Sequence, residues 1–352
     1  MDDIYQKLAR HLDNLPTGFP ATESGVELRI LKRLFTPREA EIALGLTMLP
    51  EPPEAIALRL GRDGAELAPL LEEMSRKGLI YRRARKGLNQ YMAAQFVIGI
   101  WEYHVNDLDE ELIRDVNEYL PHLMHKSWIK NETKQLRVIP VAQSLDAAIE
   151  VMPYEQAEAI INKQSRILVA PCICRKEHAM VGKGCGKLEE ACLVFGSGAY
   201  YYEQNGLGRV IEKEEALDIL KKGLDQGLVL QPGNSKKPAN ICLCCGCCCQ
   251  VLKNLNTLEK PAEVAVSNYY AVVAEEECTA CGVCAERCQM DAISMDDVAV
   301  VDRDRCIGCG LCVPTCDYEA MSLVPKDAGE RYEPPANTME TYINIARERG
   351  LI

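Results

Sequence analysis

The feature that most constrains this chain is a pattern of four cysteines that occurs twice near the C-terminus. The two copies are Cys278-x2-Cys281-x2-Cys284-x3-Cys288 and Cys306-x2-Cys309-x2-Cys312-x3-Cys316. Three cysteines on one tight loop can reach three corners of a single iron-sulfur cube, whereas the fourth enters a short helix, points away and completes the opposite cube. The spacing therefore predicts two 4Fe-4S clusters and a small fold built around them.

The same spacing predicts which cysteines share a cluster. The first cluster takes Cys278, Cys281, Cys284 and Cys316, and the second takes Cys306, Cys309, Cys312 and Cys288. Zinc is the alternative metal for these thiols. Zinc sites usually pair two CxxC hooks and do not use two CxxCxxCxxxC runs, so we expect iron.

Residues 266–324 resemble the bacterial two-cluster ferredoxins. The ββ-cluster-α pseudo-repeat of that family is visible as Ala271-Val-Val-Ala and Ala299-Val-Val-Asp. The resemblance implies two low-potential 4Fe-4S centres that transfer single electrons. Both copies depart from the family after the fourth cysteine, where Gln289 and Asp317 stand in place of its proline. Proline is not a ligand, so we expect clusters to bind and the packing around them to differ.

The other ten of the eighteen cysteines all lie between residues 172 and 249. The N-terminal MDDIYQKLAR lacks the layout of a signal peptide, and the longest apolar stretch, Met92 to Trp101, is too short to cross a bilayer. We therefore expect a cytoplasmic protein with no membrane partner, whose thiols stay reduced. Metal binding is the expected role of Cys172, Cys174, Cys185, Cys192, Cys242, Cys244, Cys245, Cys247, Cys248 and Cys249.

These ten thiols divide in the sequence into two blocks. Cys172 follows a predicted strand, and in an extended chain positions 172 and 174 point to the same face. Cys185 in a glycine loop and Cys192 on a predicted helix would complete a first site. Gly246 permits a sharp turn, so four of the six thiols between residues 242 and 249 would converge on a second site. If two clusters form, two thiols remain.

The metal in this middle region stays open at the level of sequence. We expect one or two further 4Fe-4S clusters, with zinc as the alternative because thiolate-only sites also suit zinc. Arg175 and His178 are candidate donors of hydrogen bonds to cluster sulfur, which would raise the reduction potential, or else surface charges. The ordered set CxCRxxxH, C, C and CxCCGCCC resembles a poorly characterised class of cytoplasmic 4Fe-4S proteins from anaerobes. That resemblance implies electron transfer.

The N-terminal part predicts short helices followed by two strands. Capping boxes begin at Ser24 and Thr36, and residues 79–92 predict two strands around a glycine-containing turn. This order resembles the winged helix of bacterial repressors over residues 21–95. The candidate recognition helix and wing contain the charged residues Glu66, Glu72, Glu73, Arg76, Lys77, Arg82, Arg83, Arg85 and Lys86.

The charge balance argues against DNA as a partner. The whole chain carries a net charge of -12, and the three glutamates of the candidate recognition helix would repel phosphates. We therefore expect no nucleic-acid partner and interpret the winged-helix-like part as a docking or dimerisation module. Oligomeric state is left open, with a dimer through this part as one alternative.

Together these patterns predict an α+β protein in five parts. They are a winged-helix-like domain at 1–95, a helical connector at 96–170, a cysteine-rich metal or cluster domain at 171–250, a two-cluster ferredoxin domain at 266–324 and a C-terminal extension at 325–352. We expect an electron-transfer protein or a subunit of an anaerobic redox complex, working with a redox partner protein or other subunits rather than as a stand-alone enzyme. The alternatives are a redox-sensing transcription regulator and a catalytic subunit with a substrate-binding cluster in the middle region.

Overall fold

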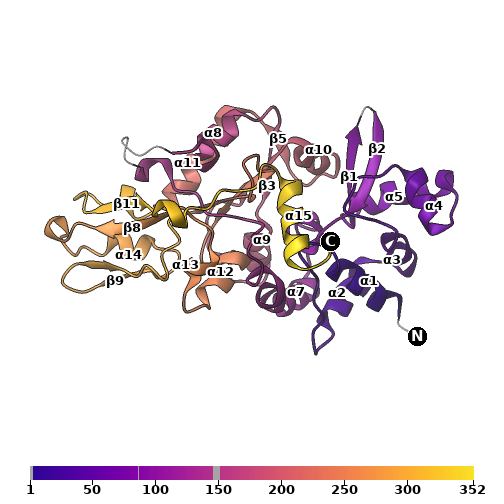
Figure 1. Ribbon diagram of the computed structural model, residues 1–352, viewed down its shortest axis with the longest axis horizontal. Coiled ribbons are helices and arrows are strands. Elements are labelled where there is room, and N and C mark those ends of the chain that lie inside the picture. Colours follow the sequence, from indigo (N-terminus) through magenta and orange to yellow (C-terminus); the bar gives the residue numbers. More distant parts are fainter. Residues whose placement is uncertain (1–2, 86, 146–150) are drawn as a thin grey trace. The chain divides into compact units, whose positions relative to one another are not determined.

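The structure is a computed structural model that describes residues 3–85, 87–145 and 151–352, so Lys86 lies outside the described residues (Figure 1). It confirms the expected mixture of helix and sheet. The chain forms two compact units, one of Met1–Thr133, Ser197–Arg209 and Tyr342–Ile352 and the other of Lys134–Gly196 and Val210–Thr341. These units are interleaved along the chain, whereas the domains expected from the sequence are contiguous. None of the described helices is long and apolar enough to span a membrane.

The first unit begins with helices and a hairpin in the predicted order. The elements are α1 (Ile4–Asp13), α2 (Val26–Leu34), α3 (Pro37–Ala43), α4 (Pro53–Leu60), α5 (Gly64–Arg76), β1 (Ile80–Arg85) and β2 (Leu88–Ala93), followed by α6 (Trp101–Tyr103) and α7 (Glu110–Leu123). Thr36 forms the expected capping box with Glu39 at the start of α3. The box expected at Ser24 is wrong, because Gly25 precedes α2 in a left-handed conformation and the Ser24 hydroxyl donates to Glu118 instead.

The hairpin of this unit is fixed by an ion pair between a buried arginine and a half-buried glutamate. Arg82 on β1 is 5% exposed, and its guanidinium pairs with the Glu72 carboxylate of α5. The helix α10 (Gly196–Gln204) supplies Tyr201, whose hydroxyl donates to the carbonyl oxygens of Ser75 at 3.1 Å and Ile80 at 3.0 Å. Arg82 is therefore part of the packing, whereas the sequence pattern placed it among the basic residues of a candidate DNA-binding wing.

The second unit contains a five-stranded sheet of order β5-β3-β4-β7-β6. Its strands are β3 (Ile167–Pro171), β4 (Glu190–Phe195), β5 (Arg209–Ile211), β6 (Val229–Pro232) and β7 (Asn240–Cys244), and its helices are α8 (Ala157–Asn162), α9 (Ile173–Met180), α11 (Lys213–Asp225), α12 (Gln250–Asn256) and α13 (Pro261–Val264). Leu243 on β7 packs directly against Gly223 of α11, where a Cβ would clash with it. Side chains alternate along a strand, so Cys242 and Cys244 point to the opposite face of the sheet from Leu243.

The ferredoxin-like part of the same unit consists of two small antiparallel sheets and a short helix. The elements are β8 (Tyr269–Val273) paired with β11 (Met321–Pro325), β9 (Ile293–Met295) paired with β10 (Ala299–Val301), and α14 (Val283–Arg287). The helix α15 (Thr338–Glu348) follows. The predicted strands at Ala271 and Ala299 are present, and both alanines are buried in one core with Cys284 and Cys312.

Candidate iron-sulfur and metal centres

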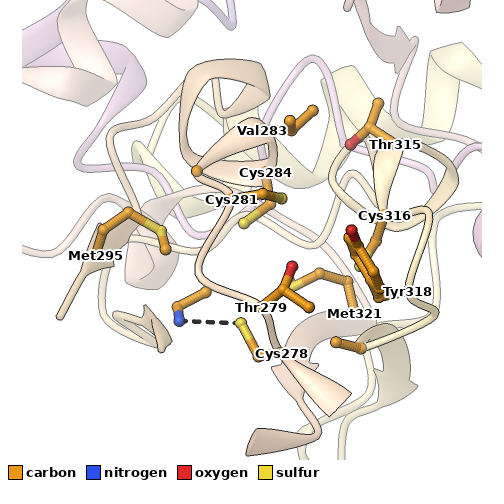
Figure 2. Close-up of a pocket in the computed structure, with 13 residues that line it drawn as sticks. Cys278, Thr279, Cys281, Val283, Cys284, Met295, Thr315, Cys316, Tyr318 and Met321 are labelled. Carbon is orange, nitrogen blue, oxygen red and sulfur yellow. Dashed lines mark hydrogen bonds between the residues drawn. The ribbon is translucent and has the colours of Figure 1, made fainter. Parts of the chain in front are cut away.

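The four cysteines predicted to share the first ferredoxin cluster line one cavity (Figure 2). Cys278 and Cys281 lie on the loop after β8, Cys284 lies on α14, and Cys316 returns from the second copy of the pattern. Thr279, Met295 and Tyr318 line the same cavity beside the four cysteines. The N–H of Ala299 donates to the Cys278 sulfur at 3.4 Å. The four thiols are the donor set that a 4Fe-4S cluster requires.

The second predicted set, Cys288, Cys306, Cys309 and Cys312, is also brought together. Burial, followed by the neighbouring Cys288 and Cys306, raises the pKa of Cys309 to about 12. The backbone N–H groups of Ala271 and Ala292 donate to the sulfurs of Cys306 at 3.4 Å and Cys288 at 3.3 Å. A thiol with this pKa is protonated at neutral pH, so metal binding at Cys309 releases a proton.

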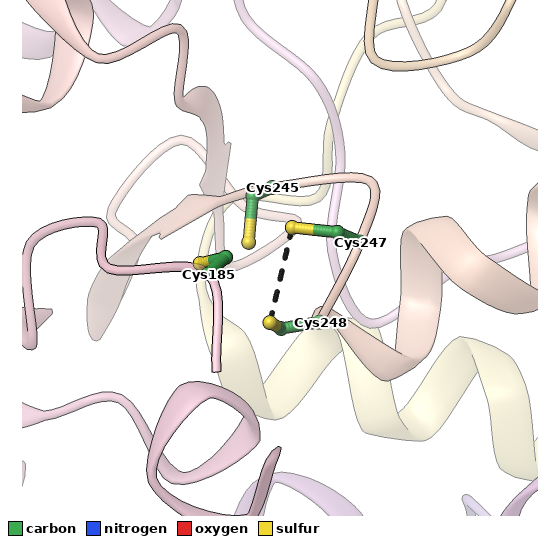
Figure 3. A group of neighbouring side chains, drawn as sticks. All are labelled: Cys185, Cys245, Cys247 and Cys248. Atoms are coloured by element: carbon green, nitrogen blue, oxygen red, sulfur yellow. Dashed lines mark hydrogen bonds between the residues drawn. The ribbon is translucent and has the colours of Figure 1, made fainter. Parts of the chain in front are cut away.

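A third group of thiols lies in the middle region (Figure 3). The sulfurs of Cys185, Cys245, Cys247 and Cys248, here called the four-thiol group, all lie within 4.8 Å of one another. Cys185 lies in the loop after α9, and the other three flank the turn at Gly246 after β7. Cys185 was expected to share a site with Cys172, Cys174 and Cys192. This prediction is wrong, because the loop after α9 carries Cys185 to the thiols of the second block.

The four-thiol group fits either of the metals that the sequence left open. Four thiolates around one zinc ion at a Zn–S distance of about 2.3 Å lie about 3.8 Å from each other. The same ligand set binds a 4Fe-4S cluster. Burial raises the pKa of Cys247 to about 11, which metal coordination would have to overcome.

The other six middle thiols form a continuous row, here called the six-thiol row. Its order is Cys172, Cys174, Cys249, Cys244, Cys242 and Cys192, with each thiol within hydrogen-bonding reach of the next. Contacts with the thiols of Cys174 and Cys244 lower the pKa of Cys249 well below its usual value. Sequence reasoning missed this row because its members come from β4, β7 and the starts of α9 and α12.

Two local predictions for this row are wrong. Cys192 lies on strand β4, directly opposite Cys242 on β7, and not on a helix. Cys172 precedes α9 and Cys174 lies inside it, so this segment is not the extended chain that would direct both thiols to one face. The two thiols still meet, because the first turn of the helix follows Cys172 immediately.

Comparison with known families adds one match. Residues 277–320 match the 4Fe-4S dicluster domain. The chain is therefore an iron-sulfur protein, with a further cysteine group in its middle region that can bind metal. No curated protein and no solved structure matches the chain.

Arg175 is a buried cation between the two middle sets of thiols. It is 5% exposed, and its guanidinium donates to the Cys245 sulfur at 3.5 Å and to the Leu243 carbonyl at 2.8 Å. Burial lowers its pKa, but the facing thiolates of Cys172, Cys245 and Cys244 raise it further, so the net pKa lies above its usual value. The surface-charge interpretation of Arg175 is wrong.

His178 has a different role from the one predicted. It is 7% exposed, so it is not a surface charge. Its Nδ1 lies 2.8 Å from the Cys174 carbonyl oxygen and its Nε2 lies 3.1 Å from Nζ of Lys253. The ring therefore contacts the backbone beside a thiol and a lysine, rather than cluster sulfur as the sequence suggested.

Gln289 joins the ferredoxin-like part to the four-thiol group. Its side-chain oxygen accepts from the N–H of Gly246 at 2.8 Å, and its carbonyl oxygen accepts from the Asn256 amide at 3.0 Å. A Cβ on Gly246 would lie 2.5 Å from the Gln289 carbonyl oxygen. The glycine therefore permits close approach between the turn and the residue that follows Cys288. The sequence marked Gln289 only as a departure from proline.

Proposed function

We propose that this protein transfers single electrons between a ferredoxin-type module and a metal centre at the four-thiol group. The observation that carries this proposal is the contact between Gln289 and Gly246, because Gln289 follows a predicted ligand of the second cluster and Gly246 lies within the four-thiol group. Bound 4Fe-4S clusters supply reversible one-electron chemistry. The eight cysteines of the tandem pattern would hold two of them, in the sets predicted from the spacing.

The cavity of the first cluster, which Cys278, Cys281, Cys284 and Cys316 line, is the proposed docking site for a redox partner. Cys281 is exposed, and the segment Glu275–Glu277, which directly precedes Cys278, is exposed and acidic. Complementary charge steers the encounter between redox proteins, so the partner is expected to present a basic surface here. An acidic docking face also agrees with the net charge of -12.

A 4Fe-4S cluster suits the four-thiol group better than zinc within this proposal. Zinc has no redox chemistry, so an electron arriving next to Gln289 would have no acceptor there. Arg175 supplies a positive charge and an N–H donor to Cys245, which stabilises the more negative, reduced state of a centre held at this sulfur.

For the N-terminal part we infer a docking or dimerisation module. The order of helices and hairpin supports the winged-helix interpretation. The burial of Arg82 against Glu72 removes one of the cations that a DNA-binding wing would need. This favours electron transfer over the transcription-regulator alternative.

A redox titration followed by electron paramagnetic resonance tests the proposal. The wild-type chain and Cys245→Ser are compared after anaerobic purification. We expect the variant to lose one redox-active centre and to keep the signals of the ferredoxin-type module. Loss of zinc from the variant with an unchanged set of redox centres would overturn the proposal.

A further inference from the structure

The six-thiol row holds more thiols than one metal centre uses. A 4Fe-4S cluster or a structural zinc ion takes four thiolates, and two clusters would need eight. A single metal centre in this row therefore leaves two thiols beside it. Six neighbouring thiolates around one centre would also concentrate negative charge, which favours keeping two of them protonated or oxidised.

The geometry of the sheet selects Cys192 and Cys242 as the extra pair. They face each other on the adjacent antiparallel strands β4 and β7. Opposed residues in such a pair have Cα atoms about 4.5–5.5 Å apart, within the range of about 4.4–6.8 Å that a disulfide spans. Directly opposite side chains also lie on one face of the sheet.

The other end of the row is a poorer candidate for a disulfide. Cys172 and Cys174 are separated by one residue, and the helix α9 begins between them. A disulfide between them would close a very small ring and unwind the first turn of α9. As ligands, by contrast, both can stay where they are.

The remaining four thiols suit metal binding. Cys172, Cys174, Cys249 and Cys244 are consecutive in the row, and Cys244 and Cys249 are buried. The Gln231 amide donates to the Cys249 sulfur at 3.7 Å. Cys192 and Cys242 each keep partial exposure, as a thiol that meets a substrate must.

We propose that Cys192 and Cys242 are a redox-active dithiol beside a metal-thiolate site of Cys172, Cys174, Cys244 and Cys249, and that this dithiol reduces disulfide substrates. One thiolate attacks the substrate disulfide, forms a mixed disulfide and releases one substrate thiol. The second thiolate then attacks the mixed disulfide, releases the other substrate thiol and leaves the Cys192–Cys242 disulfide. Two electrons and two protons return this disulfide to the dithiol.

The regeneration step rests on the proposed electron-transfer function, which delivers the two electrons one at a time from a low-potential donor. The disulfide exchange itself does not depend on it. A test of the exchange therefore separates the failure of this inference from the failure of the proposed function.

The test uses hydroxyethyl disulfide as the substrate probe on the anaerobically purified full chain. Thiols are alkylated under native conditions and again after denaturation, and the linked tryptic peptides are identified by mass spectrometry. We expect a Cys192–Cys242 linked peptide in the wild type after exposure to the probe, and its disappearance after treatment with dithiothreitol. In Cys192→Ser we expect Cys242 to be trapped as a mixed disulfide with hydroxyethyl thiol.

Metal content provides the second measurement. Cys192→Ser and Cys242→Ser should keep the wild-type iron and zinc content, whereas Cys244→Ser should lose about four irons or one zinc ion per chain. An equal loss of metal from Cys192→Ser would make that cysteine a ligand and overturn the proposal. A Cys172–Cys174 linkage, or no linkage in the wild type, would overturn it even if the variants fail to fold.

Discussion

The side-chain oxygen of Gln289 accepts a hydrogen bond from the N–H of Gly246 at 2.8 Å. This bond ties the residue after Cys288 to the turn that carries three members of the four-thiol group. Bacterial two-cluster ferredoxins, which this segment resembles, have proline at that position. Proline has no side-chain oxygen to offer, so the departure from the family pattern coincides with the contact between the two metal-binding parts.

Replacing Gln289 by alanine should slow electron transfer to the four-thiol group. The Gly246 N–H loses its acceptor, and leaving such a half-buried donor unpaired costs about 1 kcal/mol of stability. Rapid-mixing reduction of the anaerobic protein should show a slower phase for the four-thiol group and an unchanged phase for the ferredoxin-type clusters.

The matched control for this variant is Gln164→Ala. Gln164 donates its side-chain amide to the carbonyl oxygen of Ile160, next to α8. The Gln164→Ala variant removes a comparable glutamine side-chain hydrogen bond from the same compact unit. Equal rates in Gln289→Ala and Gln164→Ala would show that the Gln289 contact does not contribute to the path.

Removing the guanidinium of Arg175 should lower the reduction potential of the centre at the four-thiol group. A hydrogen bond to a charged group contributes about 1.5–3 kcal/mol, and 1.4 kcal/mol corresponds to about 59 mV for one electron, so Arg175→Ala should lower the potential by about 60–130 mV. Arg175→Lys keeps the charge and should shift it less. A potentiometric titration measures both.

Lys222→Ala is the control for a lost positive charge. Lys222 forms an exposed ion pair with Asp218 on α11 and should leave every potential unchanged. Identical potentials in Arg175→Ala and the wild type would contradict a role for Arg175 at Cys245.

The spacing of the tandem cysteines was enough to predict the ferredoxin-type part, because short-range spacing reflects the reach of one loop. The middle region was not predictable in the same way. Its grouping depends on the register of β4 against β7, which puts Cys192 opposite Cys242. It also depends on a loop that carries Cys185 away from Cys172. The spacing of cysteines within one segment does not reveal which distant segment that segment pairs with.

Buried polar contacts were equally hard to anticipate. Arginine usually lies on the surface, yet Arg82 and Arg175 are each 5% exposed. The Glu72 carboxylate compensates the buried charge of Arg82, and the Cys245 sulfur accepts a hydrogen bond from Arg175. A sequence shows the charge of a side chain but not its partner. Of these polar residues, Gln289 alone was notable in the sequence, because the ferredoxin family that this segment resembles has proline at its position.

Replacing Gly308 by alanine should remove the second ferredoxin-type cluster. Gly308 lies next to Cys309 with φ of +66°, and an added Cβ would collide with the Tyr269 carbonyl oxygen. The unfavourable backbone conformation and the steric clash should together displace the loop that contains Cys306 and Cys309. The iron content should then fall by about four per chain. Iron analysis measures the loss.

Gly329→Ala provides the comparison. Gly329 has open space where a Cβ would be added, and its φ is outside the left-handed region. Its iron content should equal that of the wild type. Full iron content in Gly308→Ala would contradict the geometry described for the cysteine loop.

The ion pair between Glu72 and Arg82 should make the first unit sensitive to acid. Burial raises the pKa of Glu72, but bonds from Arg82, Arg76 and Tyr91 outweigh it and hold the pKa below the usual 4.5. A lowered folded pKa adds stability that is present above pH 4.5 and is lost as the pH falls through the folded pKa. Glu72→Gln should therefore cost about 1–3 kcal/mol at neutral pH, since it leaves the buried Arg82 guanidinium without a counter-charge, and progressively less below pH 4.5.

Tryptophan fluorescence isolates this effect. The chain has 2 tryptophans, and Trp101 and Trp128 are both buried in the first unit. Urea unfolding at neutral and acidic pH compares the variant with the wild type, and Glu73→Gln, which removes the exposed pair with Lys77, is the control. A difference between Glu72→Gln and wild type that does not depend on pH would contradict the assignment.

The most direct test of the electron-transfer account is the content of iron, acid-labile sulfide and zinc in anaerobically purified protein. The account predicts at least about twelve irons per chain with matching sulfide, eight in the ferredoxin-type module and four at the four-thiol group. About eight irons together with one or more zinc ions per chain would contradict it, because the four-thiol group would then be structural.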